Sequence, residues 1–172
     1  MASIIERLRD TLEEEASLYE ELLGGSRRKT PAIIGEKLEE LNTITAEEQA
    51  LVNRITKVDS VRESIMMKVA GILNADPENL KLDVLIRSLD KAPEEQRALS
   101  ETADKLGTVV RQVRGVNFQN KELIDSALEM VQFEMNLLQS ANSAPQTANY
   151  GKGAYNTGEV LGAGFSGFDA KQ

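Results

Sequence analysis

The chain of 172 residues contains no cysteine, no histidine and no tryptophan. Without cysteine it has no disulfide, no thiol nucleophile and no thiolate metal site. Without histidine it lacks the side chain that most often serves as general base or metal ligand. These absences predict a protein that is not an enzyme and holds no metal or cofactor. An all-carboxylate metal site is the catalytic alternative, but adjacent glutamates such as Glu13-Glu14-Glu15 point to different sides of a helix and suit solvated faces better.

Long apolar runs and clustered positive charge are also missing. No stretch approaches the roughly 20 apolar residues of a membrane-spanning helix, and the N-terminus has no signal-peptide pattern. The net charge is −8, whereas nucleic acids and anionic membranes attract clustered lysine and arginine. The sequence GAGFSG near the end is not framed by a strand and a helix, so it predicts no nucleotide site. We expect a cytoplasmic protein without nucleic-acid, membrane or small-molecule partners.

Four prolines and one glycine pair divide the chain into predicted helices. Gly24-Gly25 predicts the end of the first helix, because glycine accepts the left-handed conformation common at helix ends. Thr30-Pro31 predicts the start of the second helix, since proline is tolerated at the first helical position. Asp76-Pro77 and Pro93 predict two further starts in the same way. The second, third and fourth helices are expected over about residues 31–73, 77–89 and 93–139.

Heptad-spaced apolar residues in the second and fourth helices predict the fold class. At 1.5 Å per residue each of these helices is ~60–70 Å long. A short helix between them favours an antiparallel return, as a long hairpin onto which the first helix packs. No strand-like alternation is present. The expected fold is all-α: a bundle of three to four helices over residues 1–140, followed by a flexible tail over residues 141–172.

The tail is rich in glycine and holds four of the seven aromatic residues. Spaced apolar side chains on such a chain suit a segment that is loose when free and docks when bound. Its partner can be a client protein, a second copy or its own bundle, and a disordered end with incidental aromatics is the alternative. The spaced apolar side chains are Tyr150, Tyr155, Leu161, Phe165 and Phe168.

Four polar residues interrupt the apolar rows. Glu48 and Arg62 either lie at the edge of the stripe and reach water, which burial statistics favour, or form a partly buried ion pair that fixes helix register, with residues of the fourth helix as candidate partners. Asn117 and Asn120 either specify register or mark, beside Phe118, a face that recognises another helix. Both interpretations of the asparagines stay open.

Two stretches resemble the FlgN family of flagellar export chaperones. EEQALVNRITKVDSVRESI, with Glu48 and Arg62, is similar to the second helix of that family. VNFQNKELIDSALEMVQFEMNLL is similar to its last helix, where two asparagines precede an apolar run. The order of helices, one short, one long, a brief connector and a second long one, is also similar over most of residues 1–140.

The resemblance implies a cytosolic chaperone without cofactor or catalysis. Such chaperones bind hook-associated (hook–filament junction) proteins, prevent their premature self-association and deliver them to the flagellar export apparatus. Glu48 and Arg62 would match framework positions of the family. Carriers of filament-cap or flagellin subunits are an alternative within the same class. A structural helical bundle that only self-associates is the alternative outside it.

An apolar groove for a client helix is expected on the later half of the fourth helix, because client terminal segments are amphipathic helices. The tail aromatics would cover this groove when it is empty or clasp the client when it is full. The hypothesis places client binding on Asn117, Asn120, Leu123, Ile124, Ala127, Leu128, Val131, Met135 and Leu138, with Tyr150, Tyr155, Leu161, Phe165 and Phe168 of the tail.

Overall fold

The computed structural model describes residues 2–143, which form four helices and no strand. The predicted all-α fold class is confirmed. The tail from residue 144 onward, with all its aromatic residues, lies outside the described residues, and the domain boundary after residue 140 stays a prediction. The helices are α1 (Ala2–Ile34), α2 (Leu38–Leu73), α3 (Leu82–Ser88) and α4 (Pro93–Ser143). Residues up to Glu134 make one compact unit, and the last turns of α4 from Met135 are considered by themselves.

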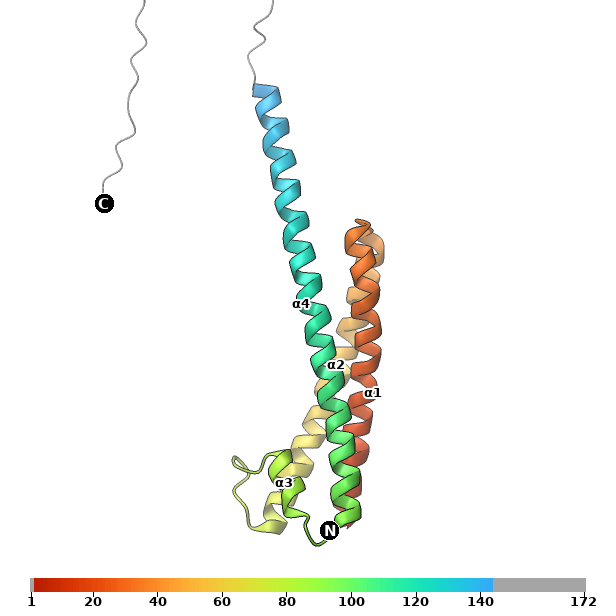
Figure 1. Cartoon of the computed structure of the whole chain (residues 1–172), viewed down its shortest axis with the longest axis vertical. Helices are drawn as coiled ribbons and strands as arrows, with labels where there is room; N and C mark the ends of the chain where they lie inside the picture. Colours follow the sequence, from red (N-terminus) through yellow and green to blue (C-terminus); the bar gives the residue numbers. More distant parts are fainter. Residues whose placement is uncertain (1, 144–172) are drawn as a thin grey trace, which may run out of the picture. The chain divides into compact units, whose positions relative to one another are not determined.

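Of the three long helices of this unit, α2 runs antiparallel to α1 and α4 (Figure 1). α4 follows α1 in the same direction, since Glu20 pairs with Lys105 and Ser26 with Asn120. α2 runs opposite to both, as the hairpin prediction requires. The opposed direction of α1 and α2 is visible in their ion pairs, which are Glu15 with Arg62, Glu21 with Arg54, Arg28 with Glu47, and Lys29 with Glu48.

One apolar core joins all four helices. Burying a leucine side chain fully contributes about 1.5–3 kcal/mol, so the buried leucines of this core hold the bundle together. α3 adds Leu85 to the core, and Leu89, directly after α3, is also a member. The Gln96 side-chain amide of α4 donates to the Ile86 carbonyl at 2.8 Å. The most deeply buried members are Leu8, Leu12 and Leu18 of α1, Val69 of α2, Leu85 of α3 and Leu99 of α4.

The prediction that the first helix ends at Gly24-Gly25 is wrong, because α1 continues to Ile34. None of the described glycines has a positive φ, so neither acts as a helix stop. The apolar face continues past the pair, with Ala32 and Ile33 buried. Each glycine costs about 1 kcal/mol of helix stability relative to alanine, and burial of the following turns outweighs that cost.

The reversal between α1 and α2 lies at residues 35–37 rather than at Thr30-Pro31. Pro31 is inside α1, one turn before its end, and Thr30 is not the cap of the next helix. The Lys37 N–H donates to the Ala32 carbonyl at 2.9 Å, and Glu36 takes the left-handed conformation with φ 54°. The signal that misled the prediction is the proline, which costs about 3 kcal/mol inside a helix. Here the burial of Ala32 and Ile33 after it outweighs that cost.

The third and fourth helices also differ from their predicted bounds. Asp76-Pro77 starts a turn, in which the Asp76 carboxylate accepts from the Glu78 N–H at 3.1 Å, and α3 begins five residues later at Leu82. α4 begins at Pro93 as predicted and ends at Ser143, four residues beyond the expected end. The early end was inferred from fading apolar spacing, which marks where packing ends rather than where a helix ends.

Replacing Gly24 by alanine tests the continuity of α1. An added Cβ at this position meets no atom within 4 Å. The substitution should therefore raise the free energy of unfolding by about 0.5–1 kcal/mol, measured by urea denaturation. Gly115→Ala, in open space on α4, should give a similar gain. A loss of stability in Gly24→Ala alone would mean that the helix ends at the glycine pair.

Candidate functional site

Ser26 is the meeting point of α1, α2 and α4. The residue is fully buried. Its hydroxyl donates to Glu48 Oε1 of α2 at 3.2 Å, and its backbone carbonyl accepts from the Asn120 side-chain amide of α4 at 2.7 Å. Gly25, beside it, faces α2: an added Cβ would lie 3.6 Å from Glu48 Cγ, an ordinary contact distance. Ser26 itself therefore binds both neighbouring helices at one level.

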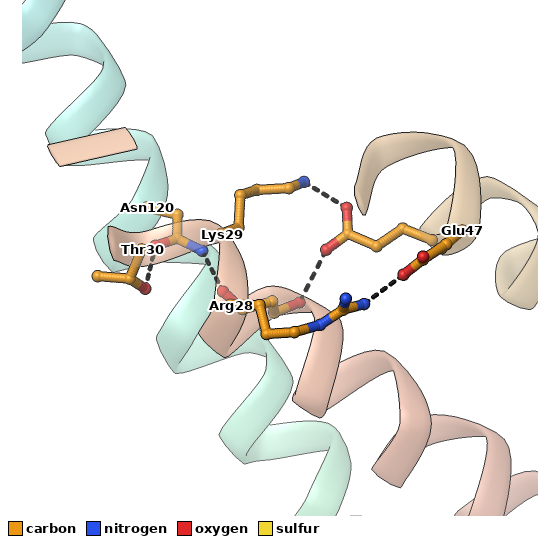
Figure 2. Close-up of polar contacts among 7 residues, drawn as sticks. Arg28, Lys29, Thr30, Glu47 and Asn120 are labelled. Atoms are coloured by element: carbon orange, nitrogen blue, oxygen red, sulfur yellow. Dashed lines mark hydrogen bonds and ion pairs between the residues drawn. The ribbon is translucent and has the colours of Figure 1, made fainter. Parts of the chain in front are cut away.

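Asn120 fixes the position of α4 along α1 (Figure 2). It is 3% exposed, and its carbonyl oxygen accepts from the Thr30 hydroxyl at 2.6 Å. The amide orientation follows from its partners, because a backbone carbonyl can only accept and therefore faces the NH₂ group. A shift of α4 by one turn would take the buried Asn120 amide away from both partners. Of the two interpretations of the asparagines, Asn120 shows the contacts of a register-setting residue.

Glu48 lies in an ion pair with α1 rather than at a solvated edge. Lys29 binds its second carboxylate oxygen, and the side chains of Glu48 and Lys29 are only 14% and 18% exposed. Arg28 and Glu47 form a more exposed pair next to it. The pair interpretation therefore describes Glu48, but its partner lies on α1 and not on the fourth helix. Glu48 and Arg62, fourteen residues apart on one helix and so about 21 Å from each other, do not pair together.

Arg62 has its own partner on α1. Its guanidinium lies 3.3 Å from Glu15 Oε2 and also binds Asp59, one turn earlier on α2. The Glu15 side chain is 5% exposed. Burial raises the pKa of the Glu15 carboxyl above its ordinary value, the Arg62 charge opposes this rise, and Asp59 adds to it. Two separate charged contacts, Lys29–Glu48 and Arg62–Glu15, therefore hold α2 against α1.

The apolar stripe of α4 continues past the residues that cover it. Val109 and Val113 are buried against the other helices, whereas the stripe residues beyond Asn120 become progressively exposed. α1 ends at Ile34 opposite this part of α4. We call this surface the open face, and it consists of Leu123, Ile124, Ala127, Leu128, Met130 and Val131. Leu128 is 62% exposed, Met130 63% and Val131 50%.

A small pocket lies between the open face and the end of α1. Its volume is about 170 Å³, and Ile33, Ile34 and Glu36 line it from the α1 side. On the α4 side it is lined by open-face residues and by Glu134. Small-molecule sites usually measure 300–1,000 Å³, so this pocket suits a single side chain of a docked segment. Exposed apolar patches of this kind mark interaction surfaces.

The remaining predicted site residues fall into three groups. Asn117 is exposed and lies beside the open face, while Phe118, 66% exposed, is on the other side of α4. Met135 and Leu138 are exposed on the last turns of α4, at 50% and 65%. The tail residues lie outside the described part of the chain.

The sequence interpretation missed the contribution of the α1–α2 reversal to this surface. Ile34 and Leu38 are 68% and 71% exposed, and Ile33 and Ile34 line the pocket. Because the first helix was expected to end ten residues earlier, these side chains were assigned to the start of the second helix. The available signal was the apolar pair Ile33-Ile34 directly before Gly35.

Two other kinds of site are absent from the described residues. Within residues 2–143 no group of three or more potential ligand side chains is placed to hold a metal ion. No helix in the same range combines the length and the apolar character that crossing a membrane demands. A larger pocket of about 540 Å³ lies by the α2–α3 connection, where Met66, Met67 and Leu80 line it together with charged residues.

Asn120→Ala tests whether this residue holds α4 in register. The substitution removes two hydrogen bonds between α4 and α1, so the free energy of unfolding should fall by about 1–3 kcal/mol in urea denaturation. Asn117→Ala is the matched control on the exposed side of the same turn, and should change it by less than about 0.5 kcal/mol. Equal effects of the two substitutions would contradict the assignment.

Arg62→Met tests the buried pair with Glu15. The pKa of Glu15 is raised in the folded state. Ionising its carboxyl therefore lowers the stability of the fold as pH rises from the ordinary pKa of a glutamate through the folded-state pKa. Removing Arg62 enlarges that cost, so the variant should lose about 2–3 kcal/mol at pH 7 and less at pH 5, where Glu15 takes up a proton more readily. Urea denaturation at both pH values measures this.

The double variant Glu15→Gln with Arg62→Met is the control for that measurement. It contains no buried carboxylate to leave unpaired, so it should recover most of the loss at pH 7. A loss that is the same at both pH values, and that the second substitution does not relieve, would assign the effect to lost packing of the Arg62 side chain.

Comparisons with known proteins place this arrangement in a family. Residues 1–157 match the FlgN protein family. The uncharacterized protein YvyG of Bacillus subtilis (strain 168) is 26% identical over 121 residues, which cover 70% of this chain and 72% of YvyG. No solved structure gave a significant match. Because the family match spans nearly the whole chain, including all four helices, this protein belongs to the FlgN family of flagellar export chaperones.

Proposed function

We propose that this protein binds hook-associated (hook–filament junction) proteins in the cytoplasm, prevents their premature self-association and delivers them to the flagellar export apparatus. The observation that supports this proposal is the open face of α4. It is the continuation of a core stripe, with apolar side chains at helix-packing spacing and no helix packed over it among the described residues. The proposed function is that of a carrier and involves no catalysis.

The chemistry of the open face suits an amphipathic client helix. A helix docks in an apolar groove through side chains at positions i, i+3, i+4 and i+7. The pocket at the end of α1 offers a site for one such side chain, next to Ala127, whose small side chain allows close approach. Met130 is flexible and polarisable, which lets one surface fit related clients. Met135 and Leu138 extend the apolar character to the last turns of the same helix.

The polar residues singled out in the sequence have different roles in the proposed client binding. The side-chain amide of Asn120 is engaged on α1, so we propose that it positions the open face rather than contacting the client. Asn117, exposed beside the open face, is available for a polar contact with the client. Glu48 and Arg62 act at a distance, by holding α2 and α1 together beneath the client.

Titration calorimetry with hook-associated proteins of the same organism tests the proposal. The variant Leu128→Glu/Val131→Glu places two charges on the open face and should weaken binding at least tenfold, because a buried, unpaired carboxylate is costly. Phe118→Glu is the matched control: an equally exposed apolar residue of α4, but away from the open face. It should change the affinity less than twofold.

Several outcomes would contradict the proposal. No binding by the unmodified protein would remove hook-associated proteins as clients, and binding of filament-cap or flagellin subunits in the same assay would give the family role another cargo. Equal weakening by both variants would move the contact away from the open face. A large stable oligomer in light scattering, without affinity for any flagellar protein, would favour the self-associating bundle.

A further inference from the structure

We propose that one exposed face of α2 is a second docking surface, and that its partner is an acidic amphipathic helix of another protein. The side chains of this face follow one another at intervals of three or four residues, which puts them on one side of the helix. All of them are exposed. We call this surface the lysine face, and it consists of Lys57, Val61, Ser64, Lys68 and Ile72.

The apolar side chains of the lysine face extend the core stripe of α2 to the surface. Val61 precedes the buried Ile65 by one turn, and Ile72 follows the buried Val69 by one turn. Val61 is nevertheless 48% exposed and Ile72 52% exposed, although the solvated side of a helix is normally polar. Within the described residues no helix packs over these two side chains. They therefore offer an apolar strip on which a further helix can pack.

The charge of the lysine face is positive, although the chain has a net charge of −8. Neither of its lysines has an ion-pair partner among residues 2–143. Arg54, 3.8 Å from Glu21 of α1, continues the positive side one turn earlier. The two acidic residues of this stretch of α2 are engaged elsewhere, since Asp59 binds Arg62 and Glu63 lines the pocket by the α2–α3 connection. The lysine face therefore favours an acidic partner.

An acidic amphipathic helix matches both properties of the lysine face. Lys57 and Lys68 are eleven residues apart on α2, which is about 16 Å or three turns. A helix with glutamates beside an apolar row presents carboxylates at the same spacing, and its apolar row packs on Val61 and Ile72. The long stems of the lysines add apolar surface on both sides of Val61, while their charges stay in water.

Other occupants fit the lysine face less well. Nucleic acids and anionic membranes attract clusters of cations, whereas these two lysines are about 16 Å apart with an apolar side chain between them. In a symmetric dimer the lysine faces of two copies would oppose each other, and like charges repel. A contact with an acidic face of a second copy would be head-to-tail and would give rings or filaments. Charge and symmetry together favour a separate protein.

The lysine face lies at a different level of the bundle from the open face. Arg62, next to Val61, pairs with Glu15 of α1, whereas Asn120, just before the open face, bonds to Thr30. Glu15 and Thr30 are fifteen residues apart on α1, which is about 22 Å. Both surfaces can therefore be occupied at once, and docking on the lysine face does not rest on the proposed function.

Fluorescence anisotropy with a synthetic peptide tests the docking on the full-length protein. The lysine face is about 22 Å long, so a helical peptide of about 20 residues covers it. The probe has a leucine at every third or fourth position and a glutamate beside each leucine. Lys57→Glu/Lys68→Glu should weaken its binding at low salt at least tenfold, because attraction at two positions becomes repulsion.

Lys81→Glu/Lys91→Glu is the matched control for that variant. It makes the same change of net charge at two exposed lysines that also have no ion-pair partner in the described part of the chain. Because both lie away from the lysine face, it should change the affinity for the peptide less than twofold.

A pair of valines tests the apolar part of the contact. Val61 and Val52 are 48% and 43% exposed, and they lie on opposite sides of α2, since nine residues make two and a half turns. Val61→Glu should weaken peptide binding at least tenfold, because the new carboxylate faces the apolar row and the glutamates of the peptide. Val52→Glu should change it less than twofold. Leu128→Glu/Val131→Glu, on the open face, should leave it unchanged.

Several results would overturn the inference. Equal weakening by the two lysine variants would assign peptide binding to overall charge, and loss of binding in Leu128→Glu/Val131→Glu would place the peptide on the open face. No peptide binding by the unmodified protein would also overturn it, and binding to phosphatidylserine vesicles instead would assign the lysine face to a membrane. A dimer in light scattering that Lys57→Glu/Lys68→Glu dissociates would assign it to a second copy. Client binding is measured separately, so its failure would leave the lysine face untouched.

Discussion

The three long helices depend on one buried hydrogen-bonded junction around Ser26. Its hydroxyl reaches α2 and its carbonyl reaches α4, so one turn of α1 sets the register of both neighbours. Apolar packing alone is tolerant of register, because heptad stripes can slide by a turn and still bury leucine against leucine. Buried polar groups are not tolerant, since a shift leaves them without partners. The junction therefore decides how far α4 extends past its companions.

That extension exposes the open face of α4. The stripe of α4 is buried up to Val113 and Asn120, and the next turns meet only the end of α1. A helix that continues its core pattern after its partners end presents a ready-made half of a helix–helix interface. Under the proposed function, a client's terminal helix completes this half. The charged pairs Lys29–Glu48 and Arg62–Glu15 keep the supporting hairpin rigid beneath it.

Much of this arrangement was predictable from spacing, and the failures share one cause. Heptad rows predicted the long second and fourth helices, their antiparallel course and the apolar run from Leu123 to Val131. Glycine and proline rules failed at Gly24-Gly25 and Pro31. They describe local preferences of about 1 kcal/mol for glycine and about 3 kcal/mol for proline, which packing of Ala32 and Ile33 overrides. The partners of Glu48 and Asn120 could not be predicted. These partners, Ser26, Lys29 and Thr30, lie on a part of α1 that was expected to be a loop.

The structure of the full-length protein bound to a hook-associated protein would test the central claim most directly. The account predicts a client helix lying along α4 from Leu123 to Val131, with one side chain in the pocket at Ile33 and Ile34, and with the Asn120–Ser26 hydrogen bond intact. A client seated instead by the α2–α3 connection, against Met66 and Met67, with the open face left free, would contradict it.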